Sequence, residues 1–155
     1  MGTGKTTVGR ALADRLGAEF VDTDSIIEAR HGSIPAIFAD HGEAQFREYE
    51  RSVARELAAR SGLVISTGGR MLVDPVNAEA LGATGVVVCL TATVDTIHER
   101  VHDDIETRPM LAGDDARSRI AALLADRAPA YARFTQVVTD GRSVDDVVDD
   151  VLALL

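Results

Sequence analysis

Hydrophobic and polar positions follow two different periods along this chain of 155 residues. Short apolar runs, several of them rich in β-branched residues, predict strands. Between these runs, apolar residues recur every three or four positions, which predicts helices. The expected strands cover residues 19–22, 63–66, 86–90 and 136–139, and the expected helices cover residues 5–16, 25–30, 33–39, 43–60, 76–81, 94–101, 116–134 and 144–154.

Residues typical of helix ends support these boundaries. Gly17 and Gly32 follow the first two helices, where glycine commonly ends a helix. Ser33 has a hydroxyl suited to capping the helix that follows it, and Pro35 falls in the first turn of that helix. Pro129 lies inside the helix predicted over residues 116–134, so a kink is expected there.

Strands and helices alternate from one end of the chain to the other. This order is typical of an α/β fold, in which a parallel sheet is flanked by helices on both faces. Because no repeat and no linker is visible, we expect residues 1–155 to form one three-layer domain. Residues 103–114 are polar and include Pro109 and Gly113, which predicts a mobile loop that acts as a lid.

Composition excludes several classes of partner. The formal net charge is −9, so a basic surface for nucleic acid is not expected. No stretch has the length of a membrane span and no signal peptide is visible, so we expect a cytoplasmic protein without a membrane partner. The single cysteine, Cys89, excludes an internal disulfide and fits a reducing cytosol.

The chain begins with a candidate phosphate-binding loop that leads into a helix and matches the end of the pattern G-x-x-x-x-G-K-[ST]. Its backbone N–H groups would face the β-phosphate of a nucleotide, the lysine would reach the β- and γ-phosphates, and the threonine after it would bind Mg²⁺. The alternative is an ordinary glycine-rich turn at the start of a helix. The residues expected to bind ATP in this loop are Gly2, Thr3, Gly4, Lys5, Thr6 and Thr7.

Two parts of this motif are missing from the sequence. Its first glycine would lie two positions before Met1, and an apolar strand would precede that glycine. Such a strand is buried on both faces in a parallel sheet. We therefore expect the first strand to be missing from the fold, so that the sheet either has a gap or closes up with a changed strand order.

Two carboxylates, Asp22 and Asp24, come at the end of the first predicted strand. Ligands of α/β sheets bind at the carboxyl ends of the strands, so both acids are candidates for a site beside the phosphate loop. One acid can hold Mg²⁺ through water, and the other can bind or deprotonate an acceptor hydroxyl. The alternative is that Asp24 caps the next helix and Asp22 belongs to a turn.

An arginine and a pair of glycines could bind an acceptor. Arg47 lies on the long helix, where Glu50 three residues later could hold its guanidinium for a bidentate grip on a carboxylate. Gly68 and Gly69 follow a buried strand and would let a substrate approach the backbone. The alternatives are a solvated arginine and a plain turn at the end of a strand.

Two further arginines are candidates for the same site. Arg108 lies in the predicted lid, where it could neutralise charge that develops on a transferring phosphoryl group. Arg127 precedes Pro129 and Tyr131 near the end of the following helix. Taken alone, either arginine could be a surface charge.

Together and in this order, these motifs resemble those of the shikimate kinase family, which are small P-loop kinases of the nucleoside-monophosphate-kinase type. The resemblance covers nearly the whole chain, and the joint order of the motifs is specific although each motif is short. The family's patterns are the phosphate loop, D-T-D, F-R-x-x-E, a cluster of three glycines, R-P-L-L and R-x-P-x-Y. In this sequence they fall on residues 2–6, 22–24, 46–50, 67–70, 108–111 and 127–131.

The resemblance implies transfer of the γ-phosphoryl group of ATP to the 3-hydroxyl of shikimate, with Mg²⁺, in aromatic amino-acid biosynthesis. Asp24 would bind the ring hydroxyls and act as the base, and Lys5 and Arg108 would complete the catalytic set. The acceptor would also contact Arg47, Gly68, Gly69 and Arg127.

The resemblance also assigns residues to the metal and to the nucleotide. Thr6 and Asp22 would hold Mg²⁺ directly or through water. Arg100 and Arg142 would lie near the adenine of ATP. We expect a monomer whose partner is a small-molecule substrate.

One position departs from the family's pattern, because Arg70 stands where the third glycine of the cluster would be. A long cation there would either block shikimate or meet another anion. Two alternative functions therefore remain at this point. One is a kinase for another polyol acid such as gluconate, or for a nucleotide, and the other is a non-catalytic, truncated nucleotide-binding module.

Overall fold

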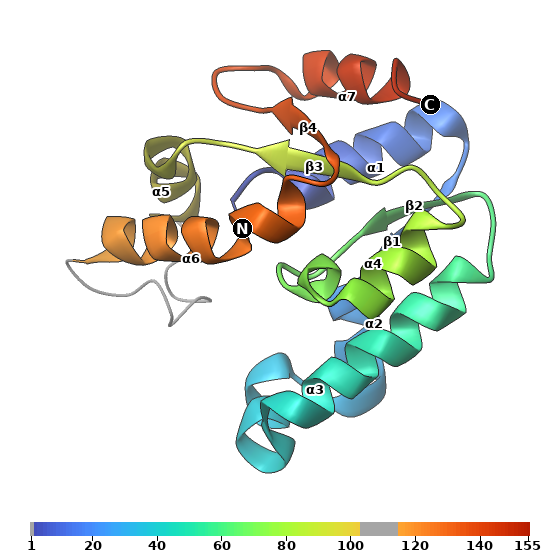
Figure 1. Ribbon diagram of the computed structural model, residues 1–155. Coiled ribbons are helices and arrows are strands. Elements are labelled where there is room, and N and C mark those ends of the chain that lie inside the picture. Colours follow the sequence, from blue (N-terminus) through green and yellow to red (C-terminus); the bar gives the residue numbers. More distant parts are fainter. Residues whose placement is uncertain (1, 103–114) are drawn as a thin grey trace.

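The computed structural model describes residues 2–102 and 115–155 (Figure 1). Met1 and the predicted lid at residues 103–114, including Arg108, lie outside the described residues. The strands in this part of the chain are β1 (Glu19–Asp22), β2 (Leu63–Ser66), β3 (Val88–Thr91) and β4 (Thr135–Val138). The helices are α1 (Lys5–Leu16), α2 (Thr23–His31), α3 (Ile34–Ala58), α4 (Pro75–Gly82), α5 (Val94–His102), α6 (Ala116–Tyr131) and α7 (Val144–Leu152), with a 3₁₀ turn η1 (Met71–Val73).

The elements agree with the sequence prediction apart from small shifts at their ends. The main difference concerns α3, which joins the two helices predicted over residues 33–39 and 43–60. Gly42 lies at the junction with a φ of 77° and a ψ of 171°, a conformation outside the helix that glycine adopts without steric cost. The chain therefore bends at Gly42, and the helix consists of the two predicted parts.

The strands form two separate parallel pairs in the described part of the chain. β1 pairs with β2, and β3 pairs with β4. A groove of about 380 Å³ separates the pairs, and its walls include Val64 of β2, Val88 of β3 and Leu12 of α1. Of the two arrangements considered from the sequence, a gap in the sheet or closure with a changed strand order, the described residues have the gap.

Side chains of β2 point alternately to two hydrophobic clusters. Val64 packs against a cluster that α1, β4 and α7 form, which includes Leu12 and Val148. Leu63 and Ile65 pack against a second cluster from α2, α3 and α4. Since successive strand residues face opposite sides of a sheet, the strands lie between two layers of helices. The predicted three-layer α/β arrangement is confirmed.

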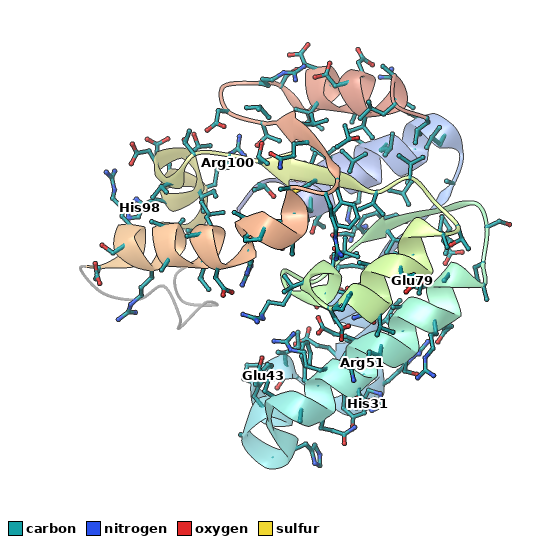
Figure 2. The ribbon with its side chains drawn as sticks, in the orientation of Figure 1. His31, Glu43, Arg51, Glu79, His98 and Arg100 are labelled. Atoms are coloured by element: carbon teal, nitrogen blue, oxygen red, sulfur yellow. The ribbon has the colours of Figure 1, made fainter. Side chains whose placement is uncertain are left out.

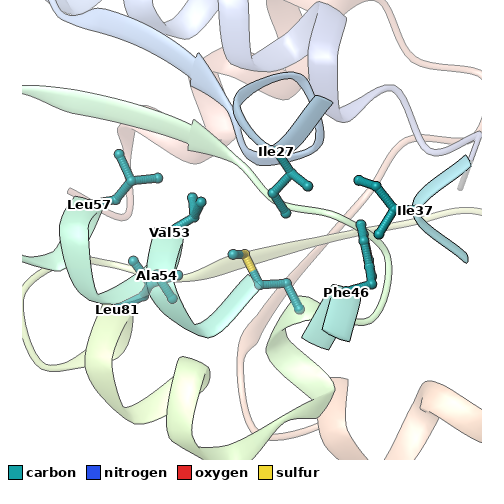
Figure 3. Close-up of a cluster of buried hydrophobic side chains, with 8 residues drawn as sticks. Ile27, Ile37, Phe46, Val53, Ala54, Leu57 and Leu81 are labelled. Carbon is teal, nitrogen blue, oxygen red and sulfur yellow. The ribbon is translucent and has the colours of Figure 1, made fainter. Parts of the chain in front are cut away.

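The second cluster fixes the segment that follows β2 (Figure 3). Met71 of η1 is completely buried, and it follows directly after residues 67–70, which we call the glycine turn. Burying a side chain of this size contributes about 1.5–3 kcal/mol, so the glycine turn is anchored at its end. The buried members of the cluster are Ile27, Ile37, Phe46, Val53, Ala54, Leu57, Met71 and Leu81.

Parallel pairing brings the acid pair and the glycine turn to one edge of the sheet. Asp22 at the end of β1 is in register with Ser66 at the end of β2. The residues that follow each strand therefore leave the sheet side by side. Thr6 in the first turn of α1 lies at the same edge, because its hydroxyl is 3.5 Å from Asp22 Oδ2. Among residues 2–102 and 115–155, no helix has the length and apolar content needed to cross a membrane.

Candidate active site

The phosphate loop has the backbone conformation that its glycines allow. Gly2 and Gly4 have φ angles of 63° and 85°, in the left-handed region that favours glycine. A Cβ on Gly2 would come within 3.0 Å of Ile97 and Val101, so α5 packs directly on the loop. Gly4 caps α1 without a side-chain hydrogen bond. Because no side chain at Gly4 accepts hydrogen bonds from the first N–H groups of α1, these groups can bind an anion.

The two carboxylate oxygens of Asp22 have different partners: one caps α2 and the other faces Thr6. Its Oδ1 accepts hydrogen bonds from the backbone N–H groups of Asp24 at 3.1 Å and Ser25 at 3.2 Å, which caps α2. Its Oδ2 lies 3.5 Å from the Thr6 hydroxyl. The alternative in which Asp24 caps the helix is therefore wrong, because Asp22 performs that role and the Asp24 carboxylate has other surroundings.

The Asp24 carboxylate lies against the glycine turn. An added Cβ on Gly68 would be 2.4 Å from Asp24 Oδ1 and 3.3 Å from Glu50 Oε1, so only glycine leaves room for both carboxylates. Burial, followed by the negative charge of Asp22, raises the pKa of Asp24, while Lys5 and Arg47 partly offset this rise. A half-buried carboxylate with a raised pKa beside a phosphate loop is a candidate base.

Arg47 is held by carboxylates on the turns before and after it. Its Nη1 donates to Glu50 at 2.6 Å, and its Nη2 donates to Glu43 at 2.7 Å. Glu50 is only 2% exposed, and burial raises its pKa while the Arg47 guanidinium lowers it in part. The predicted contact between Arg47 and Glu50 is confirmed, and it fixes the guanidinium in one orientation.

Arg127 reaches the other side of the glycine turn. A Cβ on Gly69 would come within 2.7 Å of Arg127 Nη1. The Tyr131 hydroxyl, one turn further along α6, donates a hydrogen bond to the Gly69 carbonyl. Arg127 Nε is buried without a hydrogen-bond partner within the described residues. A buried donor of this kind is suited to an anionic ligand, because it is costly to leave unpaired.

One cavity connects the phosphate loop with the glycine turn. It measures about 320 Å³, and its lining includes Lys5, Thr67, Gly68 and Arg127. Asp24 borders the same region through its contact with Gly68. The larger groove between the strand pairs also reaches Lys5 and Thr67, but its lining includes neither Gly68 nor Arg127. The smaller cavity is therefore the candidate active site, because Lys5, Gly68 and Arg127 all line it.

Arg100 and Arg142 lie in the region where β4 ends. Arg100 donates to Thr139 Oγ1 at 2.9 Å, to the Thr139 carbonyl at 2.7 Å and to the Gly2 carbonyl at 3.4 Å (Figure 2). It thereby ties the phosphate loop to the end of β4. Arg142 forms an ion pair with Asp150 on α7. The contact of either arginine with adenine stays a prediction.

The chain is similar to known proteins along its whole length. A family model described as shikimate kinase matches residues 1–155. The chain belongs to the shikimate kinase family. A shikimate kinase of Halorhodospira halophila is 48% identical over 141 residues, which cover 90% of this chain and 79% of that protein. A shikimate kinase of Symbiobacterium thermophilum is 43% identical over 159 residues, which cover 100% of this chain and 91% of that protein.

Solved structures of shikimate kinases have the same fold. The enzyme of Acinetobacter baumannii in complex with shikimate superposes with a TM-score of 0.90 at 38% identity, covering 99% of this chain and 87% of that one. The enzyme of Bacteroides thetaiotaomicron gives a TM-score of 0.91 at 34% identity, covering 99% and 93%. The fold is therefore that of a P-loop kinase of the shikimate kinase family.

Arg70 forms an ion pair with an aspartate of α6. Its Nη1 lies 3.0 Å from Asp126 Oδ2 on α6, so the side chain that replaces the family's third glycine meets an anion of this same chain. The effect of Arg70 on the acceptor, whether it blocks shikimate or meets another anion, stays a prediction.

Sequence reasoning missed several contacts that shape the site. Thr23 accepts the Gly68 N–H at 2.9 Å, and the Tyr131 hydroxyl donates to Gly69. Both contacts join segments far apart in the sequence, and no local pattern announces them. Glu43 could have been found, because a position four residues before an arginine on a helix faces that arginine.

Proposed function

We propose that this chain catalyses ATP-dependent phosphorylation of shikimate at its 3-hydroxyl, a step of aromatic amino-acid biosynthesis. The observation that carries the proposal is the common cavity of Lys5, Gly68 and Arg127, with Asp24 against Gly68. A phosphate-binding cation, a base and an acceptor-binding arginine must border one site for direct phosphoryl transfer. Membership of the shikimate kinase family selects shikimate among the possible acceptors.

The phosphate loop binds the ATP phosphates in this proposal. The backbone N–H groups of residues 2–7 face the phosphates, and Lys5 and Arg108 neutralise the charge that develops on the transferred group. Asp24 accepts the proton of the 3-hydroxyl, whose oxygen then bonds to the γ-phosphorus as the bond to the β,γ-bridging oxygen breaks and ADP leaves. The raised pKa of Asp24 makes it a stronger base than an exposed aspartate.

The shikimate carboxylate binds to Arg47 and Arg127. Arg127 Nε supports this assignment, since it is a buried donor without a partner in the part of the chain that the structure describes. Arg47 is already fixed by Glu43 and Glu50, so it loses little side-chain freedom when the substrate binds. Gly68 and Gly69 line the acceptor site, and their lack of a side chain leaves room for Asp24 and Arg127.

Thr6 and Asp22 fit a magnesium ion. The hydroxyl and carboxylate oxygens are the ligand type that Mg²⁺ prefers, and they lie 3.5 Å apart with Asp22 Oδ2 turned away from the helix cap. When bound with ATP, the ion would neutralise phosphate charge. Among residues 2–102 and 115–155, no cluster of three or more His, Cys, Asp or Glu side chains could hold a metal on its own. In this proposal the ion binds together with the phosphates of ATP.

Several finer assignments complete the proposal. Arg100 and Arg142 lie near adenine, and the enzyme works as a monomer on small molecules. The reaction takes place in the cytoplasm, where ATP is available and where a free thiol such as Cys89 stays reduced.

An acceptor screen with MgATP tests the function. ADP release is followed with shikimate, gluconate and a nucleoside monophosphate, and the expected result is stimulation by shikimate alone. Since a groove separates the strand pairs, the screen is run on this chain and on a version with an apolar extension before Met1. Stimulation by gluconate or a nucleotide would replace the acceptor, and ATP binding without turnover in both versions would favour a non-catalytic module.

Arg47→Ala should raise the KM for shikimate by about ten- to a hundred-fold while changing kcat little, because charge-assisted bonds to the carboxylate contribute to binding before and during transfer. Steady-state kinetics with varied shikimate measures this. The variant leaves Glu50 buried without its cation, so Arg47→Ala with Glu50→Gln is measured beside it. Arg55→Ala, an exposed arginine of the same helix, is the control, and an unchanged KM for Arg47→Ala would contradict the carboxylate assignment.

A further inference from the structure

Arg70 joins the glycine turn to α6 across 56 residues of sequence. Its Nη1 donates to Asp126 Oδ2 at 3.0 Å, and the two side chains are 41% and 55% exposed. The backbone of Arg70 is engaged separately, because its carbonyl accepts the Val73 N–H at 3.0 Å within the turn. The side chain can therefore be changed without removing the backbone hydrogen bond that shapes this segment.

Two other contacts join the C-terminal end of α6 and the turn after it to residues 69–72. The Tyr131 hydroxyl donates to the Gly69 carbonyl, and Arg133 Nη2 donates to the Leu72 carbonyl at 2.7 Å. Both lie on the C-terminal side of Arg127, whereas Asp126 immediately precedes it. The pair of Arg70 and Asp126 thus holds α6 at the residue that precedes Arg127.

The position of Arg127 depends on how closely α6 approaches the glycine turn. Its Nη1 lies where a Cβ on Gly69 would be within 2.7 Å, so a small displacement of the helix would move the guanidinium along the cavity wall.

We propose that Arg70 is a positioning residue for acceptor binding, because its ion pair with Asp126 holds the turn of α6 that carries Arg127 against the glycine turn. The inference rests on the proposed function, in which Arg127 binds the acceptor carboxylate. Asp126 neutralises the guanidinium of Arg70 and holds it against α6. Arg70 therefore replaces the third glycine of the family's pattern without occupying the acceptor site. Arg70 and Asp126 act as one unit, and neither touches the reacting atoms.

The expected effect is modest and specific to the acceptor. Arg70→Ala and Asp126→Ala should each raise the KM for shikimate by about two- to five-fold, since exposed ion pairs contribute little. The KM for ATP and kcat should stay unchanged. The double variant should be no worse than the worse single variant, because both remove the same contact. Exchanging the charges, with Arg70→Asp and Asp126→Arg together, should restore part of the loss.

A matched ion pair far from the site is the control. Arg15 and Asp149 join α1 to α7 at 2.6 Å, and both are exposed. Arg15→Ala and Asp149→Ala should leave the KM for shikimate unchanged. Additive single effects, a charge exchange that restores nothing, or a lower KM for Arg70→Ala would overturn the proposal, and the last result would mean that Arg70 obstructs the acceptor.

A second measurement does not depend on shikimate turnover. Amide hydrogen exchange should become faster at residues 67–70 and 126–131 in Arg70→Ala and Asp126→Ala, and not in the control variants. If the unmodified chain fails to phosphorylate shikimate, the proposed function falls, and the exchange rates alone decide whether the ion pair holds these segments together. Unchanged exchange rates would then refute it.

Discussion

Asp24→Asn should abolish shikimate-dependent ADP formation while ATP binding is retained. The amide keeps the shape of the carboxylate but cannot accept the proton of the 3-hydroxyl, and a general base contributes about 10²- to 10⁴-fold to kcat. Turnover is measured by coupled ADP release, and ATP affinity by calorimetry. Asp40→Asn, an exposed aspartate of α3, is the control and should keep full activity. An active Asp24→Asn enzyme would refute the assignment of the base.

The same variant has a second expected result, in stability. Burial raises the pKa of Asp24 above its ordinary value of 3.8, so the folded chain holds this proton at a pH where the unfolded chain has lost it. The free energy of unfolding then falls as the pH rises through that window, and the loss persists at neutral pH. Asparagine removes this loss, so Asp24→Asn should have a Tm at neutral pH equal to or above that of the unmodified chain.

The pH dependence of kcat/KM tests independently whether Asp24 is the base. A base must be ionised to accept a proton, so kcat/KM should fall as the pH drops through the raised pKa of Asp24. Burial is the first cause of that rise, and therefore the acid limb should lie above pH 3.8. An acid limb at or below that value would place the base elsewhere.

Most of the features that the sequence predicted correctly depend on local motifs. The phosphate loop, the acid pair after β1 and the contact of Arg47 with Glu50 each depend on a few neighbouring residues, and helix or strand periodicity places those residues correctly. The parallel order of the elements then brings the ends of β1 and β2 together, as Asp22 opposite Ser66 confirms. Fold class and the neighbourhood of the site were therefore accessible without coordinates.

Contacts between distant segments were not accessible in the same way. The pairs Arg70 with Asp126 and Tyr131 with Gly69 span 56 and 62 residues, and each depends on how α6 packs against η1. Sequence periodicity identifies which face of α6 is apolar, but it does not specify which part of the chain that face meets. The role of Asp22 as the cap of α2 was missed for a simpler reason, since two aspartates two residues apart compete for one helix start.

Lys5→Ala should lower kcat by about 10²- to 10³-fold and weaken ATP binding, because one preorganised cation at the transferring phosphoryl group is removed. Lys5 is the only lysine in the chain, whereas the other fifteen basic residues are arginines. An ammonium group is a compact charge on a flexible stem, and the planar guanidinium is larger and has a fixed geometry. Lys5→Arg should therefore restore little of the activity that Lys5→Ala loses.

This composition also permits a direct test of contact with ATP. Reductive methylation with a ¹³C label modifies the side chain of Lys5 and the terminal amine alone, so NMR resolves the one lysine of the protein. Addition of MgATP should shift the Lys5 signal, and ATP should slow its modification, since a lysine that contacts phosphate is shielded. Shikimate alone should do neither. A Lys5 signal that ATP leaves unmoved, in a chain that binds ATP, would remove the lysine from the phosphate site and with it the proposed mechanism.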